Sequence, residues 1–143
     1  MLKRRILSVL LVLAMLVPFA GAAQTAQDNM RGVWVASVAN IDYPSSASMT
    51  AQALAAEADT MLDNIAAMGL NTVFLQVRPS ADALYRSGLF PQSRYVSGNC
   101  GASPDGDFDV LAYWVEGAHE RGLQLHAWIN PYRITRNGRE ELD

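Results

Sequence analysis

The feature that most constrains the fold of this chain is its alternation of short apolar runs with segments of helical periodicity. Runs rich in β-branched and aromatic residues, which are typical of buried strands, cover Arg31–Val38, Asn71–Arg78 and Leu123–Asn130. The two segments between them repeat apolar residues at steps of three and four, which predicts helices with one buried side. The order strand, helix, strand, helix, strand indicates a parallel α/β architecture, either a doubly wound sheet or a barrel.

Local signals mark the ends of both predicted helices. Thr50 offers an N-cap for the first helix, and Gly69 ends it at the C′ position. Asp109 and Gly122 have the same roles in the second helix. The first helix is expected to bury Leu54, Ala58, Met61, Ile65 and Met68. The second is expected to bury Leu111, Trp114, Val115 and Ala118.

Alternation along the second and third strands separates an aliphatic face from a polar and aromatic face. The aliphatic residues, which we expect to meet the helices, are Val73, Leu75, Val77, Leu125, Ala127 and Ile129. The opposite face carries Thr72, Phe74, Gln76, Arg78, Gln124, His126, Trp128 and Asn130. A barrel can accommodate such a face in its interior, and its sites form at the carboxyl ends of the strands.

Two observations favour the barrel over a dinucleotide-binding sheet. No G-x-G-x-x-G turn is present in the chain, and the connection over residues 80–106 is far longer than usual for a strand-to-helix loop. We therefore predict the N-terminal portion of a (β/α)8 TIM-type barrel. A complete barrel takes about 250 residues, so it is incomplete in this chain.

The N-terminus has the three parts of a secretory signal peptide. Lys3, Arg4 and Arg5 precede an apolar run over residues 6–17, and small residues over 20–23 offer a cleavage site. The run is shorter than the ~20 residues of a membrane-spanning helix. We predict a signal peptide over 1–23, a flexible lead over 24–30 and a partial barrel domain over 31–143. The protein is expected to be exported, periplasmic or secreted, without a stable membrane anchor after cleavage.

Charge and cysteine content exclude several classes of partner. Loss of Lys3, Arg4 and Arg5 with the signal leaves 8 basic residues against 14 acidic ones, a net charge of −6, so no basic surface for nucleic acid is expected. The only cysteine, Cys100, lies in a turn-rich segment and is interpreted as a loop residue. With a single cysteine, no intramolecular disulfide can form.

Six blocks of sequence, in order, resemble the N-terminal part of the glycosyl hydrolase-like 10 family. They are Arg31-Gly32-Val33-Trp34, Asn40-Ile41-Asp42-Tyr43-Pro44-Ser45, Gln76-Val77-Arg78-Pro79, Ala81-Asp82-Ala83-Leu84-Tyr85, Ala118-His119-Glu120-Arg121-Gly122 and His126-Ala127-Trp128-Ile129-Asn130-Pro131-Tyr132-Arg133. The resemblance implies an exported bacterial (β/α)8 barrel that acts on glycans, with members implicated in hydrolysing cell-wall polysaccharide. One departure is Leu89-Phe90-Pro91-Gln92-Ser93, where the family tends to have an acidic-Pro-Trp-Ser stretch.

The candidate substrate-binding residues come from strand ends and from the family-like blocks. They are Asp42, Gln76, Arg78, Asp82, Tyr85, His126, Trp128, Asn130, Tyr132 and Arg133. The guanidinium of Arg78 would be costly to bury without a partner, so it either serves the site or pairs with Asp82 or with an acid on a missing strand of the barrel. Asp82 either contacts substrate or caps its own turn. Trp128 and Tyr132 either stack on a sugar ring or belong to the core.

No catalytic pair and no metal or cofactor site is assigned. Metal-dependent barrel hydrolases usually present an H-x-H pair, and the residue two after His126 is a tryptophan; His119 is expected at the surface. Glycoside hydrolysis generally needs two carboxylates. Asp105 and Asp107 are interpreted as solvated loop charges. The resemblance to the family implies that the catalytic acids lie near the end of the fourth strand and beyond, after Asp143.

The sequence therefore leaves two functional classes open. The first is a fragment of an exported glycoside hydrolase that acts on peptidoglycan-type polysaccharide by carboxylate acid/base chemistry, with the fragment alone inactive. The alternative is a non-catalytic glycan-binding module or an inert truncated product. For the hydrolase and for the glycan-binding module, the expected partner is a glycan.

Overall fold

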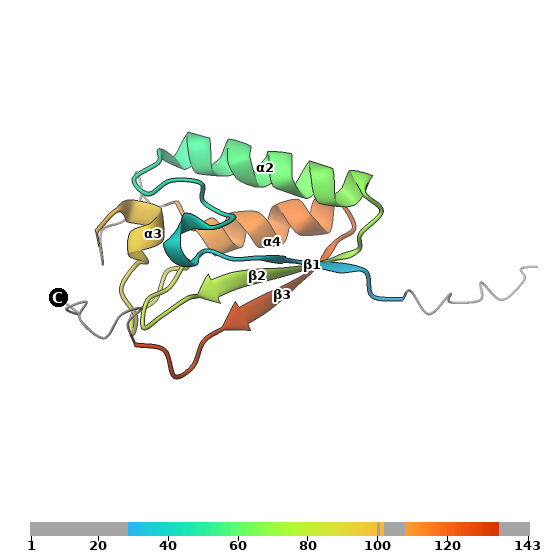
Figure 1. Cartoon of the computed structure of the whole chain (residues 1–143). Coiled ribbons are helices and arrows are strands. Elements are labelled where there is room, and N and C mark those ends of the chain that lie inside the picture. Colours follow the sequence, from blue (N-terminus) through green and yellow to red (C-terminus); the bar gives the residue numbers. More distant parts are fainter. Residues whose placement is uncertain (1–28, 100, 102–107, 135–143) are drawn as a thin grey trace, which may run out of the picture.

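The computed structural model describes residues 29–99, 101 and 108–134, which form a parallel sheet with two long helices on one face (Figure 1). The strands β1 (Gly32–Val35), β2 (Thr72–Arg78) and β3 (Gln124–Ile129) pair in sequence order. This confirms the predicted parallel α/β order. The predicted signal peptide, most of the predicted lead, Cys100, Asp105 and Asp107 lie outside the described residues.

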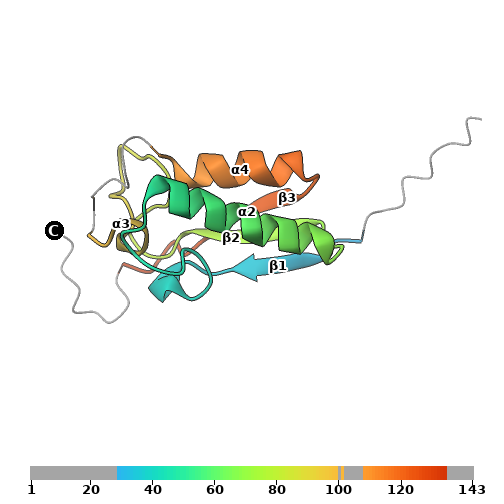
Figure 2. The ribbon, with the colours of Figure 1, turned by 90° about the horizontal axis from the view of Figure 1, so that it is seen from above.

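Two long helices cover the sheet. The helices α2 (Ala51–Ala67) and α4 (Val110–Glu120) lie side by side over the strands when the molecule is seen from above (Figure 2). Two short helices, η1 (Val38–Asn40) and α3 (Arg94–Ser97), lie beyond the carboxyl ends of the strands and contact each other (Figure 1). The loops that follow the strands therefore gather at one end of the sheet.

The predicted helix ends are confirmed. The Thr50 side chain accepts a hydrogen bond from the Ala53 amide at the start of α2. The Asp109 side chain likewise accepts a hydrogen bond from the Ala112 amide at the start of α4, at a distance of 3.0 Å. Each cap satisfies an amide that has no partner within the helix. Gly69 and Gly122 follow the helices with φ values of +73° and +68°, the left-handed conformation that suits glycine.

The core lies between the helices and β2. Val73, Leu75 and Val77 are buried there as predicted. The buried face of α2 consists of Leu54, Ala58, Leu62 and Ile65. The prediction that Met68 belongs to this face is wrong, and Met61 is only partly buried, because the steps of four and three pass through Leu62 and the helix ends at Ala67.

The buried face of α4 agrees with the predicted one at two of its four residues. It consists of Val110, Trp114, Gly117 and Ala118. Trp114 and Ala118 were predicted, whereas Leu111 and Val115 are only partly buried. Gly117 is buried because α2 passes close to it, and a Cβ atom there would lie 3.0 Å from a methyl group of Leu62. At this position α4 therefore packs its backbone directly against α2, rather than a large side chain.

The outer strands differ from the prediction in length and in burial. β1 ends at Val35, and Val38 belongs to η1, where Ala39 and Asn40 have positive φ angles. The prediction of a buried strand also fails at Trp34, which is 59% exposed. In β3 only Leu125 packs on the core, while Ala127 and Ile129 are exposed. No helix within the described ranges covers the end of β3, so the predicted burial of these two residues is wrong.

Candidate functional site

The face of the sheet that points away from the helices carries a layer of aromatic side chains. The ring of Phe74 stacks on Trp34 with 4.6 Å between centroids, and His126 lies 5.1 Å from Phe74. Trp128 meets Trp34 edge-on at 5.2 Å. Parallel register aligns Trp34, Phe74 and His126 across the three strands. We call Trp34, Phe74, His126 and Trp128 the aromatic face.

A glycine makes room for the aromatic face. A Cβ atom on Gly32 would lie 2.6 Å from the Phe74 ring, so any other residue would push that ring away. The Trp34 ring stacks on the same Phe74 ring. The Arg31-Gly32-Val33-Trp34 block therefore shapes this surface as well as forming a strand.

At the end of β2, Arg78 lies against a residue that sequence reasoning did not select. Its guanidinium carbon lies 3.7 Å from the centroid of the Phe90 ring, a cation–π contact. The Arg78 Nε atom is buried and has no hydrogen-bond partner. Among the described residues, no carboxylate lies within ion-pairing distance of Arg78. The site therefore offers a positioned cation whose buried Nε donor has no partner.

Asp82 has the local role that the sequence left open. One carboxylate oxygen accepts from the Ser80 amide at 2.9 Å, and the other accepts from the Ser93 hydroxyl at 2.6 Å. The Asp82 side chain is buried, so its carboxylate oxygens need hydrogen-bond partners within the protein, and these two bonds supply them. Asp82 thereby joins Ser80 and Ser93 at the two ends of the loop between β2 and α3. Among the described residues, it forms no ion pair with Arg78.

Asn130 links the end of β3 to the end of β2. Its side-chain oxygen accepts from the Trp128 indole N–H at 3.0 Å, and its side-chain nitrogen donates to the Pro79 carbonyl at 3.0 Å. Its backbone amide donates to the Arg78 carbonyl at 3.0 Å. These bonds hold the half-buried Trp128 ring at the end of β3. The Trp128 ring and the Arg78 guanidinium therefore lie on adjacent strands.

Gln76 and Asp42 belong to the connection between β1 and its loop. Gln76 is fully buried, and its side-chain oxygen accepts from the amides of Ser37 and Val38. Asp42 is exposed, and one of its carboxylate oxygens accepts from the Ala36 amide at 2.8 Å. The oxygen of Gln76 is thus used internally, whereas Asp42 remains accessible at the end of the sheet.

The remaining predicted residues are not brought together by direct contacts. Tyr85 is half-buried and packs on the core. Tyr132 is 96% exposed, and Arg133 is exposed beside it. The structure also adds Trp34 and Phe90 to the candidate site. The alternation of β1 was a usable signal for Trp34, whereas Phe90 lies in an irregular loop where no periodicity indicates which side chains meet Arg78.

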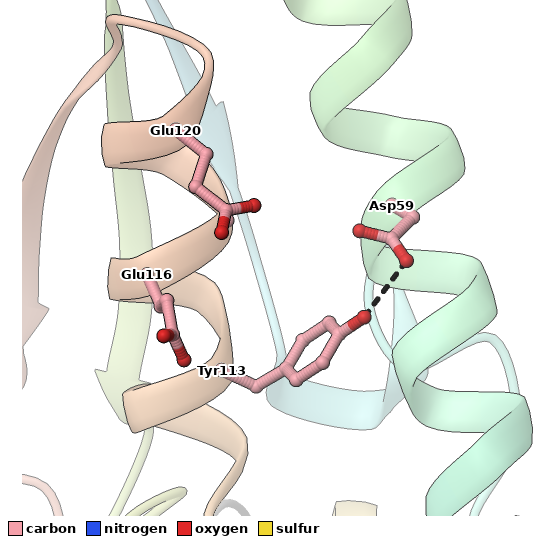
Figure 3. Close-up of a pocket in the computed structure, with 5 residues that line it drawn as sticks. Asp59, Tyr113, Glu116 and Glu120 are labelled. Atoms are coloured by element: carbon pink, nitrogen blue, oxygen red, sulfur yellow. Dashed lines mark hydrogen bonds between the residues drawn. The ribbon is translucent and has the colours of Figure 1, made fainter.

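A separate hollow lies in the helix layer, away from the strand ends. It has a volume of about 300 Å3 and is lined by Asp59, Tyr113, Glu116, Gly117 and Glu120 (Figure 3). The Tyr113 hydroxyl donates to Asp59 at 2.8 Å, and this bond is the main reason that the pKa of Tyr113 is raised.

Arg121 balances part of the acidic charge beside this hollow. Its guanidinium pairs with Asp63 at 2.6 Å and with Asp59 at 3.2 Å, which joins α4 to α2 and raises the pKa of Arg121. Within the described ranges, no group of three or more metal-ligating side chains is suitably placed to hold an ion. The helices described there also include none with the length and apolar character needed to cross a membrane.

Comparison with known proteins places these features in a family. The glycosyl hydrolase-like 10 model matches residues 29–143. Glycosyl hydrolase YngK of Bacillus subtilis (strain 168) is 44% identical over 121 residues, which cover 85% of this chain and 23% of the relative. Glycosyl hydrolase DigH of Escherichia coli (strain K12) is 35% identical over 136 residues, which cover 87% of this chain and 30% of the relative. The chain therefore spans less than a third of the length of these relatives.

Proposed function

This chain belongs to the glycosyl hydrolase-like 10 family, and we propose that it is the opening part of an exported glycoside hydrolase that acts on peptidoglycan-type glycan. The observation that carries the proposal is the aromatic face, which continues at the strand ends into Arg78 and Asn130. Ligand sites combine apolar and aromatic walls with a few placed polar groups. The apolar side of a sugar ring fits such a wall, and its hydroxyl groups fit the polar rim.

The arrangement of the sheet supports a barrel as the complete fold. Both long helices lie on the same face, and the strands pair in sequence order (Figure 2). A doubly wound sheet has helices on both faces and reverses its strand order, whereas a barrel keeps its helices outside. We therefore propose that further strands pair with the free edges of β1 and β3. Closure would also cover the exposed Trp34, since the aromatic face would line the interior.

The proposed chemistry is hydrolysis by a pair of carboxylic groups. In this mechanism one group protonates the leaving oxygen, and the other attacks the sugar or activates water. Asp82 is committed to Ser80 and Ser93, so Asp42 is the accessible acid that we assign to substrate contact. We propose that the catalytic pair comes from later strands of the barrel, with Arg78 orienting an acid or a sugar oxygen.

The N-terminal sequence supports the proposal of export. The basic start, the short apolar run and the small residues before position 24 suit a signal peptide that is removed. We propose a periplasmic or secreted protein, which places it in the same compartment as the cell-envelope glycan.

A glycan-binding module without catalysis is the second candidate. The observation that favours it is that Asp42 is the accessible acid among the described strand-end residues, so the described sheet does not itself provide a carboxylate pair. Such a module would use the aromatic face and Arg78 for binding alone.

The deciding experiment measures both binding and bond cleavage. The protein expressed from its complete reading frame, called the full-length protein below, is incubated with purified peptidoglycan glycan strands. Protein bound to the strands and new reducing ends are then both quantified. We expect release by the full-length protein and by Asp63→Asn, a control on the helix surface, and a loss of at least about tenfold with Arg78→Ala. Binding without reducing ends would support the module, and neither binding nor release would contradict both candidates.

A further inference from the structure

The loop after β1, residues 36–46, has an accessible tip on a tightly bonded base. Ile41 is 65% exposed, and Asp42 beside it is exposed as well. By contrast, Ser37 and Tyr43 on either side of the tip are fully buried. An aliphatic side chain next to a carboxylate, presented at the carboxyl ends of the strands, suits contact with a sugar ring and its hydroxyl groups.

The base of the loop is held by the side chain of Gln76 on β2. Its oxygen accepts from the Ser37 amide at 3.0 Å and from the Val38 amide at 2.9 Å. The Ser37 hydroxyl returns a bond to the Gln76 backbone carbonyl at 2.8 Å. These three bonds turn the chain out of β1 and into η1.

A short series of bonds continues from this base to Asp42. Ala36, which precedes the two amides held by Gln76, donates its amide to the Asp42 carboxylate. The Ala36 carbonyl accepts from the amides of Asp42 and Tyr43 at 3.0 and 3.3 Å. The position of the Asp42 carboxylate therefore depends on the direction in which the chain leaves β1.

The far side of the loop is anchored separately. The Asn40 side-chain nitrogen donates to the carbonyls of Pro44 and Tyr95, each at 2.7 Å. The Tyr43 hydroxyl donates to the Leu54 carbonyl at 3.1 Å. Loss of the Gln76 bonds would consequently displace the base and Asp42 without detaching the whole loop.

We propose that Gln76 is a positioning residue that sets the Asp42 carboxylate for contact with the glycan. This inference rests on the proposed function and gives Gln76 an indirect role in place of direct substrate contact. The Gln76 nitrogen is buried without a partner, so the useful half of the amide is its oxygen. A carboxylate at position 76 would keep that acceptor, whereas a thioether of similar size would remove it.

Substitutions at position 76 in the full-length protein separate these roles. Gln76→Met removes the acceptor, and we expect the KM for glycan to rise about tenfold, as for one or two lost hydrogen bonds, with a smaller change in kcat. Gln76→Glu retains the acceptor and should restore KM to within about threefold of the parent. The matched control is Gln92→Met, which removes another glutamine nitrogen that is buried without a partner. We expect no change in KM for this variant.

Two further measurements distinguish positioning from general stability. Hydrogen exchange of the amides over residues 36–43 should accelerate in Gln76→Met and not in Gln92→Met. Asp42→Asn should raise KM on its own. Because both changes act through the same carboxylate, the double variant should be no worse than the weaker-binding single variant.

The outcomes separate failure of this inference from failure of the proposed function. If the parent cleaves glycan but the effects of Gln76→Met and Asp42→Asn multiply, the two residues act independently and the inference is overturned. Unchanged exchange over residues 36–43 in a folded Gln76→Met protein overturns it too. If Gln76→Met does not fold, the inference is overturned by a KM for Gln76→Glu that is as high as the KM for Asp42→Asn. A parent that neither binds nor cleaves glycan refutes the proposed function, and the positioning role fails with it.

Discussion

The two faces of the sheet differ in how completely their apolar side chains are covered. On the helix side, Trp114 and the aliphatic residues of β2 are fully enclosed, and α2 and α4 are joined by Arg121 with Asp59 and Asp63. On the opposite side, Trp34 is open to solvent. Buried donors without a partner occur on both sides, at the Trp114 indole on the helix side and at Gln76 and Arg78 at the strand ends, so the two faces differ in the coverage of their apolar surface. The helix side is a finished core, whereas the aromatic side has the composition of a surface that is completed by something else. Stability should therefore reside on the first and binding on the second.

The largest expected effect tests the finished side. Trp114→Ala in the full-length protein should lower the free energy of unfolding by about 3–5 kcal/mol, because it removes a buried ring that packs edge-on against Tyr43. Urea denaturation measures the loss. Leu89→Ala, a truncation of an exposed aliphatic residue, is the control and should change stability by less than about 0.5 kcal/mol. A similar cost for both would mean that the helix side is not the main core.

The matched substitution on the aromatic side tests whether later strands of the proposed barrel enclose the Trp34 ring. Trp34→Ala should cost about 3 kcal/mol in the full-length protein if later strands enclose the ring, which is typical for truncation of a buried aromatic residue. It should cost well under that value if the ring stays as exposed as it is here. Urea denaturation measured beside Trp114→Ala gives the answer. A negligible cost would contradict the proposed barrel and would leave the aromatic face as an open platform.

A glycine at the end of α3 tests the loops that carry the site. Gly98 has a φ of +83°, and a Cβ atom there would overlap the Ser48 hydroxyl, so Gly98→Ala should destabilise by about 1–3 kcal/mol. Thermal unfolding measures this change. Gly88→Ala is the control, since nothing lies within 4 Å of its Cβ position. Equal effects of the two substitutions would show that the contact between the two loops is unimportant.

The contact between Phe90 and Arg78 should affect binding more than stability. Phe90→Leu keeps an apolar side chain but removes the ring beneath the guanidinium, so we expect glycan affinity to fall about threefold to tenfold, as for about 0.5–1.5 kcal/mol. Isothermal titration with glycan fragments measures this change. Leu89→Ala again serves as the control. A loss of stability without a loss of affinity would assign Phe90 to the core.

The smallest effect concerns pH and the helix layer. The pKa of Tyr113 is raised mainly because its hydroxyl donates to Asp59, so the folded state holds this proton more tightly than the unfolded state. The resulting stability is complete below the ordinary tyrosine pKa of about 10 and is lost as pH rises through the higher folded value. Tm measured between neutral pH and about pH 11 should fall less in Tyr113→Phe than in the parent. An identical fall would contradict the bond.

Local features of this protein were predictable because they depend on neighbours in the chain. The caps at Thr50 and Asp109 and the glycine stops at Gly69 and Gly122 were correct, since each involves residues within a few positions. The strand alternation also placed Phe74 and Gln76 on the same face as His126 and Trp128. The error at Met68 was local, because the helix ends at Ala67. Other errors arose where a partner distant in sequence decided the result, as for Val38, whose amide donates to Gln76 in a helical turn.

The candidate site shows the same division. Residue types at the strand ends predicted which side chains gather there, but not what each one does. Asp82 is used by Ser80 and Ser93, and Arg78 lies against Phe90 with no described carboxylate within ion-pairing distance. Loop geometry sets these contacts, and no periodic pattern encodes it.

The sequence by itself determined the strand and helix order, the parallel pairing that this order requires and the family to which the chain belongs. Spacing of three, four or two residues and short-range capping are sufficient for the order, because they are properties of the local backbone. The alternation of strand and helix in turn favours parallel pairing. Only the tertiary structure decided that Gln76 faces the loop after β1, that Phe90 supports Arg78, and that the aromatic face is open while the helix side is closed. Those outcomes depend on packing between segments far apart in the chain, where small shifts in direction choose the partner of each polar atom.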